Sequence, residues 1–298
     1  MNTDDIRRRL RKRANEIGLE FQQAVQYYAI ERFLYRLSRT VWVNKLIVKG
    51  ATMLRVWEGA VARPTRDIDF LGNLDNNIKV IQGAVADCLN ANVPEDGLVF
   101  DQSTTAERIA LESRYPGIRV KIRGDLAGAR FILRLDIGID DAVVPKPGWV
   151  DYPVLLGGPT PRILAYSPAS SVAEKFETMV KLGLVNSRLK DYFDIWMLAT
   201  TQSFNGIELT SALRATFERR ETPLPTAPPV ALTSEFVNQA ASRKRWANFC
   251  EKLTESAVEV PDDLGEIVIL IVEFLGPVLQ EAGSDSINAT WYPGRGWE

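Results

Sequence analysis

The 298-residue chain contains no histidine and only two cysteines. Without histidine it has neither the commonest general acid–base nor the commonest metal ligand, so catalysis must rest on carboxylates, lysines or a metal held by oxygen. Cys88 and Cys250 lie far apart in sequence and show no metal-binding spacing. This pattern argues against a disulfide framework and favours a reducing cytoplasmic setting with two small buried thiols.

Long apolar runs are also missing. The N-terminal stretch "MNTDDIRRRLRKRANEIG" has no apolar segment of the kind that a secretory signal requires. The most apolar stretch, "IVILIVEFLGPVL" from Ile267, is interrupted by Glu273 and is shorter than the ~18 to 20 residues of a membrane span. We therefore expect a buried C-terminal helix, a cytoplasmic protein and no membrane partner.

Charge of one sign does not dominate. Lys plus Arg number 36 and Asp plus Glu number 38, a net charge of −2, so no global basic field indicates nucleic-acid binding. An RNA partner would therefore have to bind a local basic surface. The alternative is that the basic clusters are ordinary solvent-exposed helix faces. The densest basic clusters of the C-terminal half are Arg214, Arg219 and Arg220, and Arg243, Lys244 and Arg245.

The composition is that of a globular protein, with 46% hydrophobic and 25% charged residues. At about 150 residues per domain, the length predicts two domains. The first half reads as mixed helix and strand. Helical patterns dominate after a Pro- and Gly-rich stretch at 145–168, which is typical of a linker or loop. We predict an α+β fold with domains at 1–165 and 166–298.

The first domain begins with two helices within 4–39, the first strongly basic. A short buried strand "LIVKG", a helix "ATMLRVWEG" opened by Gly50 and a strand "DIDFLG" follow. A helix is expected near 75–90. The remaining expected strands are "LVFD", "TTAERIA", "IRVKIRGDL" and "ARFILRLDIGID".

Two helices are predicted after residue 166. In the first, Ser167 precedes Pro168, Ser171 and Glu174 have the spacing of a capping box, and Gly183 is the expected end. The next begins in "NSRLKDYFDIWML", with Asn186 or Ser187 as its cap, and its Asp191 and Asp194 share one face.

Asp67 and Asp69 pose an electrostatic problem. Their i, i+2 spacing sends both carboxylates to one face of a strand, where a divalent cation would offset the repulsion. Mg²⁺ with a polyphosphate substrate is the natural setting for one or two such carboxylates. Asp136, on a strand that reads as buried, is the expected third acid. The alternative is that an arginine such as Arg134 neutralises Asp136.

The turn Gly50-Ala51-Thr52 opens the predicted helix just before these acids. A turn of small residues at a helix start offers free backbone N–H groups to phosphates, and Thr52 adds a hydroxyl. The alternative is an ordinary helix start.

Together these pieces resemble the polymerase β type of nucleotidyltransferase fold: a turn of Gly and a small residue, a helix, a strand with two spaced aspartates and a later third acid. The chain more closely resembles the AbiEii/AbiGii toxin family of nucleotidyltransferases. The resemblance covers roughly residues 20–250 and rests on "VKGATMLRVWEGAVARPTRDIDFLG", "RLDIGIDDAVVP", "SVAEKFETMVKLGLVNSRLKDYFDIWML" and "TFERRETPLP".

The resemblance implies a role for each matching residue. The turn would bind nucleotide phosphates, although Ala51 stands where the wider fold has Ser or Gly. Lys175, Arg66 and Arg188 would neutralise the triphosphate, and Lys190 falls in the last motif. The implied metal ligands are Asp67, Asp69 and Asp136, and the implied catalytic residues are these three with Lys175, Asp191 and Asp194.

The implied function is that of a toxin in a toxin–antitoxin or phage-defence pair. It would use Mg²⁺ or Mn²⁺ to move a nucleotide from an NTP to an RNA, with the acceptor end of tRNA expected, and so block translation. The implied partner is a cognate antitoxin of the transcriptional-repressor type. The alternatives are an NTP- or GTP-binding toxin without transfer, a small-molecule nucleotidyltransferase and, least favoured, a non-catalytic interaction protein.

Overall fold

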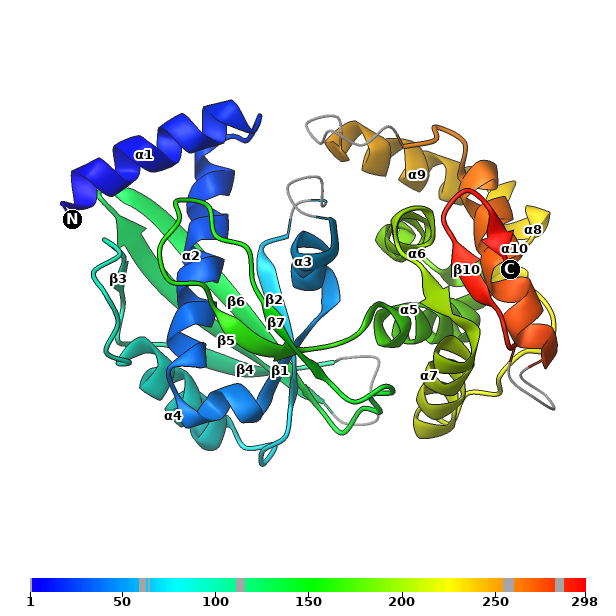
Figure 1. The fold of residues 1–298 in the computed structure, drawn as a ribbon, viewed down its shortest axis with the longest axis horizontal. Coiled ribbons are helices and arrows are strands. Elements are labelled where there is room, and N and C mark those ends of the chain that lie inside the picture. Colours follow the sequence, from blue (N-terminus) through cyan, green and yellow to red (C-terminus); the bar gives the residue numbers. More distant parts are fainter. Residues whose placement is uncertain (1, 59–62, 64, 111–115, 254–259, 282–286) are drawn as a thin grey trace. The chain divides into compact units, whose positions relative to one another are not determined.

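The computed structural model describes residues 2–58, 63, 65–110, 116–253, 260–281 and 287–298. The chain divides into two compact units. The first comprises Met1–Asp140 and Gly148–Ala165, and the second comprises Asp141–Pro147 and Tyr166–Glu298. The predicted α+β class is confirmed, because the first unit holds a mixed sheet with helices and the second is mainly helical (Figure 1).

The first unit contains most of the strands. Its helices are α1 (Thr3–Glu16), α2 (Phe21–Ser38), α3 (Leu54–Glu58) and α4 (Ile78–Leu89), with 3-10 turns η1 (Val41–Asn44) and η2 (Gly50–Met53). Its strands are β1 (Leu46–Lys49), β2 (Asp67–Gly72), β3 (Val99–Phe100), β4 (Thr105–Ile109), β5 (Gly117–Leu126), β6 (Ala129–Ile139), β7 (Gly148–Asp151) and β8 (Arg162–Ala165).

All eight strands join one sheet. Seven follow the order β3-β5-β6-β2-β1-β8-β7, and β4 also pairs with β5. The central strands β2 and β6 run parallel, whereas β1 pairs with β2 and β5 pairs with β6 in antiparallel fashion. The strand that carries Asp67 and Asp69 therefore lies in the middle of the sheet.

Alternation along the central strands gives the sheet an apolar face and a charged face. Ile68 and Phe70 of β2 and Leu135 and Ile137 of β6 are fully buried. Helix α2 packs against β6, and α1 and α4 pack against α2 (Figure 1). Because the helices cover the apolar face, the intervening charged residues are directed to the opposite face.

Two expectations need correction. The stretch 145–168 is not a plain linker, because it forms β7 and β8, and β8 pairs in parallel with β1. The helix predicted in "ATMLRVWEG" is split into η2 and the short α3, and its last residue, Gly59, lies outside the described residues.

The second unit is built on helices. They are α5 (Pro168–Leu182), α6 (Leu189–Thr201), α7 (Gly206–Arg219), α8 (Ser234–Val237), α9 (Ala240–Leu253) and α10 (Leu264–Glu281), with 3-10 turns η4 (Gly183–Val185) and η5 (Val230–Leu232). A small sheet joins β9 (Phe204–Asn205), β10 (Thr290–Tyr292) and β11 (Gly296–Trp297).

The C-terminal tail "WYPGRGWE" packs on the helical core. The Trp291 indole donates to the carbonyl of Ala199 at 2.7 Å, and the Trp297 indole donates to that of Phe274 at 2.9 Å. Phe274 packs against both indoles, which also pack against each other. The predicted C-terminal helix is α10, and its apolar face is buried.

Candidate active site

The acids of β2 lie on the charged face of the sheet. Asp69 pairs with Lys49 of β1 on one side and with Asp136 of β6 on the other. Asp67 lies opposite Arg134, and its Oδ1 is 3.4 Å from Arg134 Nη1. The predicted common face of the two aspartates is therefore present, and Asp136 lies beside Asp69 on it.

Asp136 is neutralised by an arginine that the sequence reasoning missed. Arg119 of β5 donates to both carboxylate oxygens of Asp136, with Nε at 2.7 Å from Oδ1 and Nη2 at 2.6 Å from Oδ2. The hydrogen bond to Asp136 raises the pKa of Arg119 above its ordinary value. The alternative that an arginine neutralises Asp136 is confirmed, but the arginine is Arg119, and Arg134 lies against Asp67 instead.

A sequence signal could have found Arg119. The β5–β6 hairpin closes through Ala127 and Gly128, both with positive φ, as in the two-residue turns that match strand twist. Counting back from the pair Leu126 and Ala129 places Arg119 opposite Asp136.

The turn at Gly50 lies directly against Asp69. Gly50 has φ +68°, and a β-carbon there would collide with the Asp69 carboxylate. Glycine is therefore required twice, for the backbone conformation and for the close approach. Ala51, which follows in the turn, is buried.

Thr52 has a different place from the one expected. It is fully buried, and its hydroxyl donates to the carbonyl of Asp67 at 3.2 Å. Thr65 donates to the same carbonyl at 3.1 Å. In this arrangement Thr52 positions the start of β2, and its hydroxyl is engaged by backbone.

The residues fit a two-carboxylate metal site better than a three-carboxylate one. Within the described ranges, no group of three or more acids, cysteines or histidines is arranged to hold a metal ion. Both oxygens of Asp136 are bound by Arg119. Asp67 and Asp69 remain a suitable pair, because Mg²⁺ needs only one or two carboxylates when substrate phosphates and water supply the other ligands.

Lys175 of α5 holds two buried acids of α6. Its Nζ is 3.1 Å from Asp191 Oδ1 and 2.6 Å from Asp194 Oδ2, and both carboxylates are at most 1% exposed. Burial alone would raise the pKa of Asp191, but Lys175 and Arg188 outweigh burial and lower it. Lys175 is therefore held in place between two buried acids, as a largely buried side chain on the face that α5 turns to α6.

The start of α6 differs from the prediction. Arg188 occupies the cap position, and Asn186 Oδ1 accepts a hydrogen bond from the Arg188 backbone at 2.8 Å. The Arg188 side chain instead reaches forward, and its Nε lies 2.5 Å from Asp191 Oδ2. Lys190 and Arg66 are exposed.

At α5, Ser167 is the cap, and it accepts from the backbone of Ser170. The proposed capping box of Ser171 and Glu174 is wrong, because the Glu174 carboxylate accepts from the Tyr166 hydroxyl at 3.0 Å. The predicted end at Gly183 is confirmed, with φ +52°.

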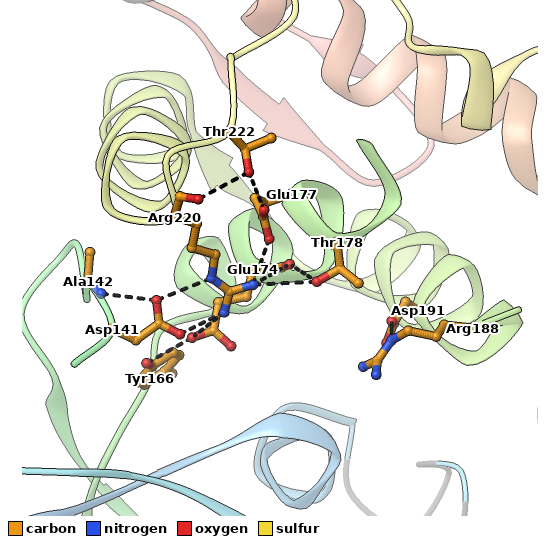
Figure 2. A network of polar contacts seen from close by, with 10 residues as sticks. All are labelled: Asp141, Ala142, Tyr166, Glu174, Glu177, Thr178, Arg188, Asp191, Arg220 and Thr222. Atoms are coloured by element: carbon orange, nitrogen blue, oxygen red, sulfur yellow. Dashed lines mark hydrogen bonds and ion pairs between the residues drawn. The ribbon is translucent and has the colours of Figure 1, made fainter. Parts of the chain in front are cut away.

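Arg220 is not part of a basic surface. Its guanidinium is buried among Asp141, Glu174 and Glu177, at 2.7, 3.5 and 2.8 Å (Figure 2). Burial lowers the pKa of Arg220, but these carboxylates outweigh burial and raise it above its ordinary value. The predicted RNA-binding cluster of Arg214, Arg219 and Arg220 thus loses one of its three cations.

A family model described as "Nucleotidyl transferase AbiEii toxin, Type IV TA system" matches residues 32–266. The chain belongs to the AbiEii toxin family. The family match covers both units and includes Gly50, Asp67, Asp136, Lys175 and Asp194.

Two solved structures from Helicobacter pylori are similar to this AbiEii-family chain. One is a candidate nucleotidyltransferase at 15% identity, and the other is JHP933 at 17% identity. Each has a TM-score of 0.47, and each alignment covers 89% of this chain and 96% of the other. The search of curated proteins found no match.

Family membership confirms the predicted toxin and nucleotidyltransferase class. It implies a nucleotide substrate and an antitoxin partner. In the described part of this AbiEii-family chain, no helix has both the length and the apolar character needed to cross a bilayer.

Proposed function

We propose that this AbiEii-family toxin moves a nucleoside monophosphate from an NTP to an RNA, and that the acceptor end of tRNA is the site of addition. The observation that carries the proposal is the packing of the Gly50 turn against Asp69, beside Asp67 on the charged face of the sheet. This arrangement supports a turn that would bind phosphates beside two carboxylates that would bind a metal.

Asp67 and Asp69 would hold Mg²⁺ or Mn²⁺, which when bound offsets negative charge on the triphosphate and on the departing pyrophosphate. The backbone N–H groups of the Gly50 turn would orient the phosphates. Asp136 keeps Arg119 fixed at the side of Asp69. In the helical unit, Lys175 is fixed by Asp191 and Asp194, and it would be the positive group for the triphosphate that the family resemblance implies.

The proposed reaction needs no reactants other than the NTP and the acceptor RNA. The acceptor hydroxyl oxygen attacks the α-phosphorus, a P–O bond to pyrophosphate breaks, and the hydroxyl proton leaves to solvent or to a carboxylate. The result is an RNA longer by one nucleotide. Such an addition would block translation and growth, and a cognate antitoxin would oppose the effect.

Labelled transfer tests the proposal. The purified protein is incubated with each α-³²P-labelled NTP and total tRNA, with Mg²⁺, Mn²⁺ or EDTA. We expect metal-dependent label on RNA, and a drop of at least ~100-fold in Asp69→Asn, because that carboxylate is one of the two that would hold the metal, whose positive charge offsets the charge that develops during transfer. The Asp69→Asn toxin should also cease to inhibit growth.

The matched control is Glu107→Gln, which removes a carboxylate whose partner, Lys121, lies on the neighbouring strand β5. It should transfer at the wild-type rate, and thermal unfolding verifies that both variants fold. Wild-type transfer by a folded Asp69→Asn protein would refute the metal assignment. Label retained on the protein but never on RNA would instead favour a nucleotide-binding toxin, and label on a small molecule would favour the small-molecule alternative.

A further inference from the structure

The helical unit contains a cavity of about 430 Å³ that the proposed chemistry does not use. It lies where the start of α6 meets the C-terminal half of α9. Residues of α9 that line it recur on one face of that helix, at i, i+3, i+4 and i+7: Arg245, Asn248, Phe249 and Lys252. Arg188 and Lys190 line it from the α6 side.

The lining of this cavity is cationic. Four of its eight residues are basic, and none of the eight is acidic. Of these cations, Arg188 is paired with Asp191, so its charge is partly offset. Arg245, Lys190 and Lys252 are exposed. Their accumulation in a chain of net charge −2 gives a local attraction for polyanions.

The shape of the lining selects among anions. Arg245 and Lys252 are two helical turns apart, about 10 Å along the axis. Each strand of a nucleic-acid helix carries a phosphate about every 3.4 Å of axis, so a strand that lies along α9 can present a separate phosphate to each cation. Phe249 is partly exposed and is held by Phe193 and Trp246, with ring centroids 5.5 Å from each. A fixed aromatic ring beside cations suits an unpaired base.

We infer that this cavity binds single-stranded RNA, with Arg245 and Lys252 on the phosphates and Phe249 against a base. The inference rests on the proposed function, since it assigns a binding surface to the RNA acceptor. Arg188 joins the cavity to the buried cluster around Lys175, because it lines the one and is bonded to Asp191 in the other.

The test measures RNA binding without chemistry. A fluorescent 12-nucleotide single-stranded RNA is titrated with the full-length protein in EDTA at several salt concentrations. The variant Arg245→Gln with Lys252→Gln removes two cations from the cavity. The matched control, Arg243→Gln with Lys244→Gln, removes two exposed cations of the same helix that do not line the cavity.

We expect the cavity variant to bind at least 10-fold more weakly at low salt. Its plot of log affinity against log salt should flatten by about 1.4, which is two phosphates at ~0.7 each for a single strand. Phe249→Leu should weaken binding with the slope unchanged. The control should keep both affinity and slope.

Equal losses of affinity in the cavity variant and the control would overturn the inference, because they would show that RNA responds to the general positive charge of the helix. Unchanged binding by the cavity variant would also overturn it. Displacement of the RNA by NTP alone at equal phosphate concentration would assign the cavity to free nucleotide instead. Failure of the proposed function is seen separately, as absence of label transfer by the wild-type protein.

Discussion

Gly50 meets two requirements at one residue: a left-handed backbone conformation and a close approach to the Asp69 carboxylate. Ala at φ +68° incurs the left-handed cost of ~1 to 2 kcal/mol, and its β-carbon also displaces the Asp69 carboxylate. We expect Gly50→Ala to lower the free energy of unfolding by more than this cost and to abolish transfer. Urea unfolding and the labelled assay measure both.

Gly18→Ala is the matched control for this substitution. Gly18 has φ +69°, and a β-carbon there would meet no atom within 4 Å. The Gly18→Ala protein should therefore lose only the ~1 to 2 kcal/mol of unfolding free energy that the left-handed conformation costs, and it should keep full activity. An active Gly50→Ala protein, or one no less stable than Gly18→Ala, would contradict the proposed contact between the turn and Asp69.

Glu31 of α2 makes stability depend on pH. Burial raises its pKa to about 7, although Arg32 and the Leu155 backbone N–H, which donates to Oε2 at 2.6 Å, favour the ionised form. The folded state therefore binds more protons than the unfolded state between about pH 4.5 and 7. We expect the free energy of unfolding to fall as pH rises through this window.

The change to examine is Glu31→Gln, which keeps the acceptor for Leu155 and removes the titration. Chemical unfolding at pH 5, 6, 7 and 8 should show a shallower decline in the variant than in the wild type. Parallel pH profiles would show that another group is responsible. The comparison of slopes is independent of any change in absolute stability.

At the residue scale, strand periodicity was sufficient to place Asp67 and Asp69 on one face. Periodicity alone does not choose the partner of Asp136, because Arg134 shares its face of β6 and Arg119 lies on the neighbouring strand β5. The choice between them depends on strand register, which the two-residue turn at Ala127 and Gly128 fixes.

Between elements, Lys175 links α5 to α6 through buried charge. Removing one partner of such a group costs about 3 to 5 kcal/mol, because it leaves carboxylates buried without compensation. We expect Lys175→Met to be destabilised by that order, and to transfer more slowly even when corrected for the folded fraction. Urea unfolding and single-turnover transfer are the measurements.

Two companion variants locate the cause. Lys181→Met, at an exposed position of the same helix, should change stability by less than ~0.5 kcal/mol. Adding Asp194→Asn to Lys175→Met should recover part of the stability, since it removes the carboxylate that Lys175 approaches at 2.6 Å. A lack of recovery would assign the loss to packing, and wild-type transfer by Lys175→Met would remove Lys175 from the site.

Elements with strong local signals were predictable, and those that depend on distant pairing were not. The apolar alternation of β5 and β6 and the cap and end of α5 at Ser167 and Gly183 are all local. By contrast, β8 has four residues, and its parallel neighbour β1 lies more than a hundred residues earlier. Nothing in the Pro- and Gly-rich stretch around β8 reports that partner.

For the whole molecule, composition and hydropathy predicted a mixed first half and a helical second half, and both are present. The path of the chain between the units was not predictable. Residues Asp141–Pro147 leave the first unit, join the second and return to form β7. The anchors of this excursion, Asp141 with Arg220 and the Val144 carbonyl with Ser170, are side-chain contacts without a sequence pattern.

This excursion means that no single cut of the chain yields both units whole. A cut between Ala165 and Tyr166 leaves Asp141, one of the three carboxylates around Arg220, on the N-terminal piece, so the two pieces should recognise each other when produced together. Copurification of the pieces should weaken with Asp141→Asn and persist with Asp151→Asn, which changes an exposed residue of β7. A transplanted helical unit would need residues 141–147 supplied as a separate segment.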